Sequence, residues 1–230
     1  LDDVESRGLG DVYKRQNRGR TKMKIINPSF QLLEEIDGIQ MLKKIEKAGR
    51  VCYKSEDKIT EDSAIKFVNA IIERGHESVL EHESITISII CDRGVSHEIV
   101  RHRIASYSQE STRYCNYSKD KFGNELTFIK PSFWNEKDPR YIIWEKQMEQ
   151  AEIAYNSLIN NGASPQEARS VLPNSLKTEI VVTMNIREWR HFFRLRVSTA
   201  AHPQMREIAQ MILKAFQDRI PVLFDDIEES

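Results

Sequence analysis

The sequence predicts an α+β protein in which a mainly antiparallel sheet is flanked by helices within a single domain. Segments with strand-like and helix-like periodicity are interspersed along the chain, and the helical segments differ in length. No glycine-rich turn joins a strand to a helix: the 230 residues include 9 glycines, and neither GxGxxG nor GxxxxGKS/T occurs. These observations argue against a Rossmann or P-loop nucleotide site. A chain of this length is long enough to bury a substantial core.

The charge balance is nearly even, with 34 lysines and arginines against 35 aspartates and glutamates and a net charge of -1. A chain with so little net charge does not attract nucleic acid as a whole, so an anion site requires a local basic cluster. No apolar run is long enough to predict a membrane span. The three cysteines, Cys52, Cys91 and Cys115, lack CxxC spacing and a secretory signal, so we expect reduced thiols in a cytoplasmic protein.

The first residues do not resemble the rest of the chain. Residues 1–22 show neither helical nor strand periodicity, and the stretch DVESRGLGDVYKRQ resembles a translated sequencing adapter. The sequence from Met23 onward has the character of a bacterial start. We therefore expect residues 1–22 to be a non-native or disordered extension, and residues 23–230 to form the domain.

The first predicted elements are a short strand near residues 24–27 and a helix over residues 38–48. Gly49 is the expected stop of that helix. In the next helix apolar residues recur at three- and four-residue spacing. Thr60 is its expected cap and Gly75 its left-handed stop.

Residues 84–91 (SITISIIC) alternate in the manner of a half-buried strand. Asp92 is the expected cap of a helix that runs to His102. The serine-rich stretch after Arg103 has no clear period, so we expect a turn, the kind of segment in which binding residues are common.

Capping signals mark the helices of the second half. Asp138 and Pro139 open a long amphipathic helix that ends near Asn160. Ser164 and Glu167 form a capping box for a further helix.

Residues 176–184 predict another strand. Asn185 and Glu188 form a second predicted capping box, which opens a helix through Val197. The last predicted helix begins at Pro203 and runs to residue 219.

The densest polar cluster follows the predicted helix of Asp92. Three arginines and a histidine (Arg101, His102, Arg103 and Arg113) lie within thirteen residues, with several hydroxyls between them. Guanidinium groups bind phosphate or carboxylate through two parallel hydrogen bonds, so the pattern favours an anionic ligand. A solvated helix end is the alternative. Glu98 weighs against it, because its spacing places it on one helical face with Arg101 and His102.

Two further groups are candidates. His76 and His82, with acids between them, suggest zinc, but neither HExxH nor HxxEH is present, so we expect no metal. In the second group Arg187 and His191 share one helical stripe. Its aromatic residues are expected in the core, and Arg196 flanks their stripe, where a partly dry guanidinium binds an anion strongly.

The string Arg101-His102-Arg103, followed after seven residues by Ser111-Thr112-Arg113, resembles the signature of the flavin-dependent thymidylate synthases. The motifs His76-Glu77-Ser78, Arg169-Ser-Val-Leu-Pro173, Asn185-Ile-Arg187 and Leu195-Arg196 occur in the family order, so the resemblance extends from Met23 to the C-terminus. It implies an enzyme that makes dTMP from dUMP, with methylene-tetrahydrofolate as carbon donor and NADPH as reductant through bound FAD. It also implies a homotetramer with active sites at subunit interfaces.

The resemblance assigns site residues position by position. Glu98 stands where some members have glutamine and Gln109 where some have glutamate. Arg196 is implied to stabilise the ionised uracil as the catalytic residue, because a guanidinium stays protonated and lowers the pKa of an acidic partner. The implied FAD contacts are His76, Ser78, Glu81, Arg101, His102, Arg103, Gln109, Asn185, Arg187, His191 and His202. The implied dUMP contacts are Glu98, Arg101, Gln109, Glu110, Ser111, Thr112, Arg113, Arg169 and Arg196.

Other classes of function remain open at this point. A non-catalytic nucleotide- or RNA-binding module would use the same arginines as a phosphate patch, with steep salt dependence and no bound flavin. A metallohydrolase built on His76 and His82 would be abolished by a chelator. A purely structural subunit would bind no ligand.

Overall fold

The computed structural model describes residues 23–117 and 125–228. The expected N-terminal extension, residues 1–22, lies outside the described residues, and the domain boundary at Met23 stays a prediction. The described residues form two compact units. The sheet unit comprises residues 27–110, 131–133 and 177–228, and the α5 unit comprises residues 23–26, 111–117, 125–130 and 134–176.

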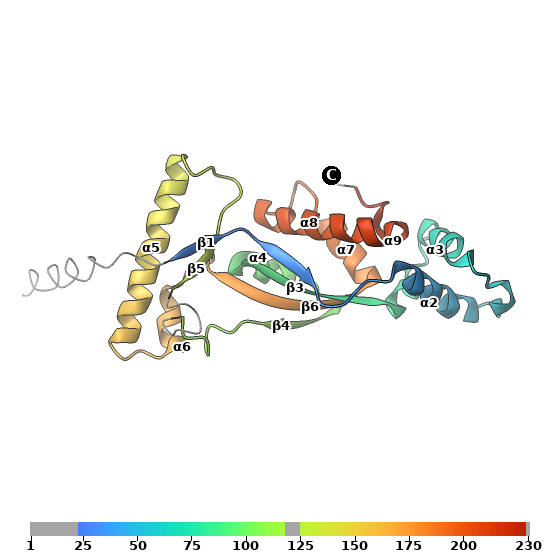
Figure 1. Cartoon of the computed structure of the whole chain (residues 1–230), viewed down its shortest axis with the longest axis horizontal. Helices are drawn as coiled ribbons and strands as arrows, with labels where there is room; N and C mark the ends of the chain where they lie inside the picture. Colours follow the sequence, from blue (N-terminus) through green and yellow to red (C-terminus); the bar gives the residue numbers. More distant parts are fainter. Residues whose placement is uncertain (1–22, 118–124, 229–230) are drawn as a thin grey trace, which may run out of the picture. The chain divides into compact units, whose positions relative to one another are not determined.

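A four-stranded antiparallel sheet forms the centre of the sheet unit, with strand order β2-β3-β6-β4 (Figure 1). Its strands are β2 (Ser29–Leu32), β3 (Ser84–Asp92), β4 (Ala105–Gln109) and β6 (Lys177–Asn185). The two central strands pair along their whole length, from Ser84 opposite Asn185 to Asp92 opposite Lys177. The prediction of an α+β fold with a mainly antiparallel sheet is confirmed.

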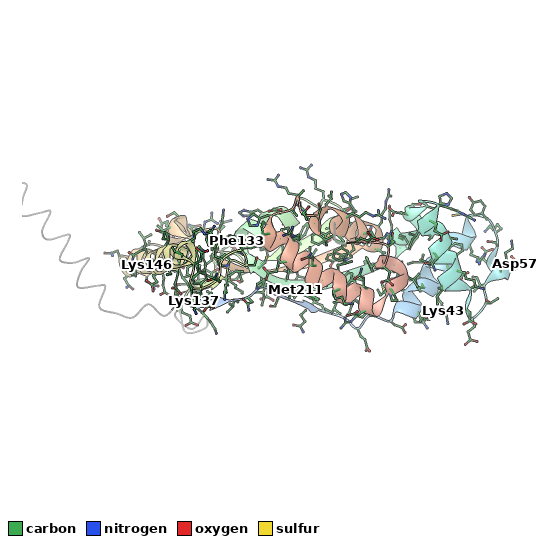
Figure 2. All side chains as sticks on the ribbon, turned by 90° about the horizontal axis from the view of Figure 1, so that it is seen from above. Lys43, Asp57, Phe133, Lys137, Lys146 and Met211 are labelled. Atoms are coloured by element: carbon green, nitrogen blue, oxygen red, sulfur yellow. The ribbon has the colours of Figure 1, made fainter. Side chains whose placement is uncertain are left out.

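One face of this sheet builds the core of the unit. Ile85, Ile87 and Ile89 on β3 are buried, as is Val182 on β6, in keeping with the alternation read from the sequence. Helices α4 (Arg93–Ile99), α7 (Ile186–Arg196) and α8 (Pro203–Arg219) contribute further core residues. The aromatic side chains of α7 are fully buried, as predicted: Trp189, Phe192 and Phe193. In Figure 2, Met211 marks the outer face of α8, where it is 40% exposed.

The remaining elements of the sheet unit are short helices. They are α2 (Gly38–Val51), η1 (Glu56–Lys58), α3 (Ser63–Glu73), η2 (Glu77–His82) and α9 (Pro221–Phe224). Helix α2 packs against α3 and η2, and η2 packs against α7. These contacts place η2, which carries two of the expected flavin residues, beside α7, which carries two more.

Two predicted helix boundaries are wrong. Helix α2 continues through Gly49, where a Cβ atom would lie 2.6 Å from the ring of Phe67, so the glycine permits close packing instead of stopping the helix. Helix α3 starts at Ser63 and not after Thr60, whose N–H donates to Ser63 Oγ at 2.9 Å. Gly75 follows α3 with a φ of 70°, as a left-handed stop requires.

The stretch after Arg103 is strand β4 and not the expected turn. Ser106 and Ser108 are exposed, whereas Tyr107 and Gln109 between them are half-buried. The Tyr107 hydroxyl donates to the carbonyl of His102 at 2.5 Å. Serines on the outer side of an edge strand weaken the hydrophobic alternation that would have identified it.

The α5 unit combines a small parallel sheet with a long helix. Strands β1 (Lys24–Ile26) and β5 (Thr127–Ile129) pair in parallel. Helix α5 (Pro139–Asn160) precedes α6 (Pro165–Ala168) and η4 (Arg169–Val171). The unit has a small apolar core of its own, formed by Tyr117, Leu126, Phe128, Met148, Ala151, Tyr155, Ala168 and Leu176.

Local signals define the helix starts of this unit well. Asp138 accepts from the Arg140 N–H at 2.9 Å, with Pro139 in the first turn, as predicted. The Ser164–Glu167 capping box is also confirmed. In neither unit does a described helix have the length and hydrophobicity required to span a membrane.

Candidate active site

A chain of hydrogen bonds links α7 with α4 and the turn that follows it. The Arg196 guanidinium donates from Nη1 to Glu98 Oε2 at 2.9 Å, from Nη2 to the Glu98 carbonyl at 3.2 Å and from Nε to His102 Nε2 at 3.2 Å. His102 Nδ1 lies 2.9 Å from Glu188 Oε1. Because α7 and α4 both pack on the core face of the sheet, residues 98 positions apart in sequence meet here.

The imidazole of His102 is buried, with 4% of the residue exposed. Burial lowers the pKa of His102, and the positive charge of Arg196 lowers it further, while the hydrogen bond to Glu188 acts in the opposite direction. The net shift is downward, so the ring is neutral near pH 7. A neutral ring accepts a hydrogen bond at one nitrogen and donates at the other.

Two arginines beside this network have no anionic partner in the described part of the chain. Arg101 and Arg103 are exposed on either side of buried His102. Exposed His191 meets the His102 ring edge-on, with ring centroids 5.6 Å apart. Guanidinium groups without a protein carboxylate are available to an anionic ligand.

Beside η2, the first turn of α7 carries a charged pair in addition to Arg196 and Glu98. Asn185 caps α7 by accepting from the Glu188 N–H at 2.8 Å. Arg187 Nη1 lies 2.6 Å from Glu81 Oε1, and both side chains are largely exposed. The hydrogen bond to Glu81 raises the pKa of Arg187, which keeps the guanidinium charged.

Several expected site residues lie apart from this network. His76 and Ser78 are exposed at η2. His202 is exposed at the start of α8, with its ring centroid 6.1 Å from that of Phe133. The side chains of these three residues make no hydrogen bond or ion pair with other described residues of the sheet unit.

Gln109 and Glu110 have protein partners. The Gln109 amide donates to Ser96 Oγ at 2.8 Å and to Thr178 Oγ1 at 3.2 Å. Glu110 forms an ion pair with Lys177 at 2.8 Å. Both contacts fasten the end of β4 to its neighbours in the sheet unit.

The other expected dUMP residues belong to the α5 unit. Arg169 Nη1 lies 3.5 Å from Thr112 Oγ1, so two of the implied dUMP residues lie close together. Ser111 Oγ accepts from the Arg113 N–H at 3.3 Å. The exposed guanidinium of Arg113 lies over the ring of Tyr114, 5.4 Å from its centroid.

A group with metal-ligand chemistry lies at a place other than the one the sequence suggested. His76 and His82 are both exposed, whereas the ligand atoms of His102, Glu188 and His191 lie within 4.8 Å of one another. Arg196 donates to His102 Nε2 and Glu188 faces Nδ1, so both nitrogens of that ring have partners. The adjacent guanidinium charge opposes cation binding.

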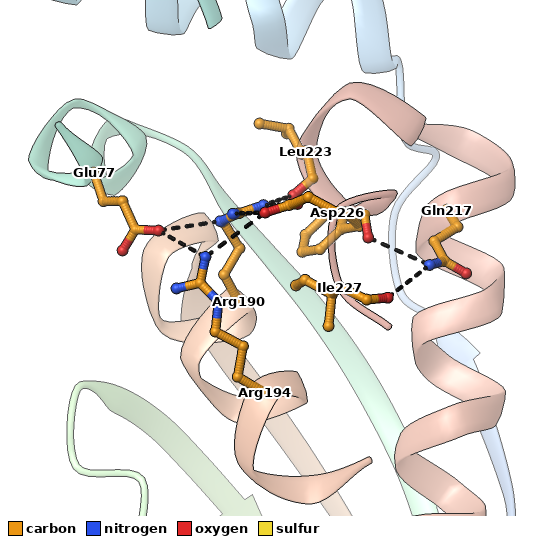
Figure 3. Close-up of polar contacts among 8 residues, drawn as sticks. Glu77, Arg190, Arg194, Gln217, Leu223, Asp226 and Ile227 are labelled. Carbon is orange, nitrogen blue, oxygen red and sulfur yellow. Dashed lines mark hydrogen bonds and ion pairs between the residues drawn. The ribbon is translucent and has the colours of Figure 1, made fainter. Parts of the chain in front are cut away.

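Helix α7 also carries an arginine with a different environment (Figure 3). Arg190 is completely buried and binds Asp226 through Nη1 at 2.7 Å and Nη2 at 2.5 Å, while Nη1 also donates to the Leu223 carbonyl. Arg190 Nε and Arg194 Nη2 both reach Glu77 Oε1, at 3.4 and 3.0 Å. This network fastens η2 and the C-terminal segment to α7.

Sequence reasoning did not assign Glu188 or Arg190 to these networks. Glu188 occupies the third position of α7, where the spacing predicts a capping box. Only half of that box forms, because the Glu188 carboxylate contacts His102. No local signal distinguishes the two outcomes, since His102 is 86 residues away in the sequence.

Comparisons with known protein sequences match this chain to thymidylate synthases of one family. A family model described as thymidylate synthase complementing protein matches residues 33–222. A flavin-dependent thymidylate synthase of Geobacter sulfurreducens is 38% identical over 186 residues, which cover 78% of this chain and 78% of that protein. One from Pyrococcus furiosus is 40% identical over 166 residues, or 72% of this chain and 67% of that protein.

A solved structure shares the fold. The UMP/dUMP methylase PolB from Streptomyces cacaoi, bound with 5-Br UMP, superposes with a TM-score of 0.71. The alignment covers 89% of this chain and 95% of that chain at 20% identity. At this identity the likeness concerns the architecture alone.

Proposed function

Because the chain belongs to the family of flavin-dependent thymidylate synthases, we propose that residues on the α7 face of the sheet unit bind its flavin, and that the arginines of the α5 unit bind phosphate. The enzyme methylates dUMP to dTMP, with FAD as cofactor and with methylene-tetrahydrofolate and NADPH as co-substrates. The observation that carries the site proposal is the placement of partly exposed Arg196 beside a neutral, buried imidazole.

The residues present fit a flavin dinucleotide. Its pyrophosphate requires cations that are not already neutralised, and exposed Arg101 and Arg103 supply them within the described sheet unit. Arg187, held at Glu81, and exposed His191 add donors along α7. We assign these residues, with Ser78, His102 and Asn185, to FAD, and extend the assignment to His76, Glu81, Gln109 and His202. Bound FAD supplies the redox chemistry, and the protein supplies orientation and charge.

Arg196 is the proposed catalytic residue. Its side chain is 19% exposed, so its charge is only partly solvated while part of the guanidinium remains open to a ligand. A fixed positive charge at the uracil ring favours the ionised base, because it stabilises the anion more than the neutral form. Arg196 stays protonated and therefore acts by charge and hydrogen bonding, not as a base.

The nucleotide phosphate requires a second set of cations. Arg113 and Arg169 of the α5 unit suit a phosphate, and Ser111 and Thr112 add hydroxyl donors. The family resemblance also assigns Glu98 and Gln109 to dUMP, and both side chains have hydrogen-bond partners in the sheet unit. Arg101 and Glu110 complete the proposed dUMP set.

We further propose a cytoplasmic homotetramer with active sites at subunit interfaces. Cys52 and Cys91 are reduced thiols, as a reducing compartment would leave them. Sedimentation equilibrium of the purified protein tests the tetramer, and a stable monomer that methylates dUMP would contradict it.

The visible absorption spectrum, recorded before and after addition of FAD and dUMP, tests the proposed site. We expect a flavin band that shifts on addition of dUMP, followed by dTMP formation when folate and NADPH are supplied. Protein that binds no FAD and binds RNA with steep salt dependence would instead support the phosphate-binding alternative.

A further inference from the structure

The side chain of Glu188 has a use other than capping its own helix. Glu188 is at the third position of α7, and its N–H donates to the cap residue Asn185 at 2.8 Å. In a capping box its carboxylate would return to the cap residue's N–H. Instead Glu188 Oε1 contacts His102 Nδ1 at 2.9 Å, and Glu188 is only 7% exposed. A carboxylate is costly to bury, so a contact made in the interior requires a strong partner.

The partners of the ring fix where its proton lies. Arg196 Nε is a donor without a lone pair, and it lies 3.2 Å from His102 Nε2, so Nε2 must carry the acceptor lone pair. The ring proton is therefore on Nδ1, where it is donated to the Glu188 carboxylate. A carboxylate accepts and cannot donate, so Glu188 selects this tautomer over the other.

The tautomer in turn determines the direction of the Arg196 guanidinium. Nη1 and Nη2 of Arg196 are held by the Glu98 carboxylate and carbonyl, at 2.9 and 3.2 Å, and Nε is held by the ring nitrogen. If the proton moved to His102 Nε2, two N–H groups would face each other and the Nε contact would be lost. The remaining contacts, all with Glu98, would leave the plane of the guanidinium less restricted.

We propose that Glu188 is a positioning residue that acts through His102: by holding the imidazole proton on Nδ1, it orients the Arg196 guanidinium toward the pyrimidine ring. This inference rests on the proposed function in that Arg196 is taken to meet the pyrimidine. The predicted capping role does not require the carboxylate, because the Asn185 side chain satisfies the cap without it.

The test is Glu188→Gln in the full-length, FAD-loaded protein. Glutamine has nearly the same shape, but its amide can accept from or donate to Nδ1, so only the 3.2 Å contact from Arg196 Nε is left to favour the Nδ1-protonated tautomer. Nitrogen NMR of protein labelled in its histidine rings reports which nitrogen carries the proton, and His102→Asn assigns the signal. We expect the Nδ1-protonated ring in the wild type and a mixture of tautomers in Glu188→Gln. We also expect turnover of saturating dUMP to fall about tenfold with FAD absorbance kept.

Asp226→Asn is the matched control. It removes a carboxylate that also binds an arginine of α7, but one that contacts Arg190 and not the His102 ring. We expect it to leave the ring tautomer and the dUMP turnover unchanged. The same loss of turnover in both variants, with no change of tautomer, would overturn the proposal.

The nitrogen NMR spectrum of the wild-type protein tests the proposed tautomer even if Glu188→Gln does not fold. A wild-type ring with its proton on Nε2 would overturn the positioning role outright. The NMR measurement requires no catalysis, so absent dTMP formation in wild-type protein would count against the proposed function and not against the selection of the tautomer.

Discussion

Arg190 and Arg196 are six residues apart on helix α7 and have different surroundings. Arg190 is fully buried and binds Asp226 through two nitrogens, with Glu77 beside its third (Figure 3). Arg196 is 19% exposed and directly contacts one carboxylate, one carbonyl and a neutral ring. Each guanidinium has a carboxylate partner, but the Arg190 side chain is fully enclosed, whereas the Arg196 side chain keeps part of its surface open to a ligand. The first arrangement stabilises the fold and the second is suited to a ligand.

The largest expected effect comes from removing the buried arginine. Arg190→Leu removes the main partner of Asp226 and the more distant of the two arginines at Glu77. Because Arg190 is completely buried, we expect the loss to cost about 3 kcal/mol. Urea unfolding of the protein without ligands measures the loss. The matched control is Arg194→Leu: Arg194 contacts the same two carboxylates from a side chain that is 46% exposed. It should cost less than about 1 kcal/mol. Equal losses would show that burial does not separate the two arginines.

Replacing the half-buried Arg196 should lower enzyme activity strongly and stability very little. Arg196→Lys keeps one positive charge but replaces a planar group with a single ammonium, which cannot contact His102 and both Glu98 oxygens together. We expect dUMP turnover to fall about 100-fold, with the urea midpoint and the flavin spectrum nearly unchanged. Turnover at the wild-type rate would contradict the assignment of Arg196 to the pyrimidine.

Features of the fold that depend on neighbouring residues could be predicted from the sequence. Several signals carried by a few adjacent residues are confirmed, namely the Asp138 cap, the Ser164–Glu167 box and the left-handed Gly75. The expected Thr60 cap is the exception, because α3 begins at Ser63. Periodicity identified the central strands β3 and β6, because their alternating residues form the core. These signals depend on local geometry, which a single sequence contains.

Contacts between distant elements were not predictable in the same way. Gly49 was interpreted as a stop, but its role is set by the Phe67 ring on another helix. The same limit applies to Glu188, whose carboxylate contacts His102 in place of its own helix. The family motifs supplied the candidate site residues, yet no motif told Arg190 from Arg196. Their difference depends on burial and on partners that only the folded chain brings together.

The carboxylate partner of Arg190 provides a test by pH. Burial raises the pKa of Asp226, but the hydrogen bond and charge of Arg190 outweigh it, so the net shift is downward. A carboxyl with a depressed pKa stabilises the fold above its unfolded value, near 3.8, and this stability is lost as pH falls through the lower folded value. Asp226→Asn should therefore cost about 1 kcal/mol at pH 7. The thermal midpoints of variant and wild type should converge as pH falls below 3.8 and through the lower folded value. A constant difference across this range would contradict the linkage.

The smallest effect is expected at the exposed end of the helix, where Arg187 and Glu81 are paired at 2.6 Å with side chains 52% and 42% exposed. Exposed pairs contribute little to folding, so Arg187→Gln should leave the thermal midpoint of the FAD-free protein unchanged. Its charge is nevertheless available to a phosphate, so FAD affinity should fall about fivefold, with a weaker dependence on salt. Lys44→Gln is the control, because Lys44 is an exposed cation that pairs with Glu83 at 3.0 Å and is not assigned to the flavin. Fluorescence titration with FAD separates the two variants. If both bind FAD equally, Arg187 belongs with the structural arginines, and orientation by protein partners would matter more than exposure in deciding which arginines of this helix meet a ligand.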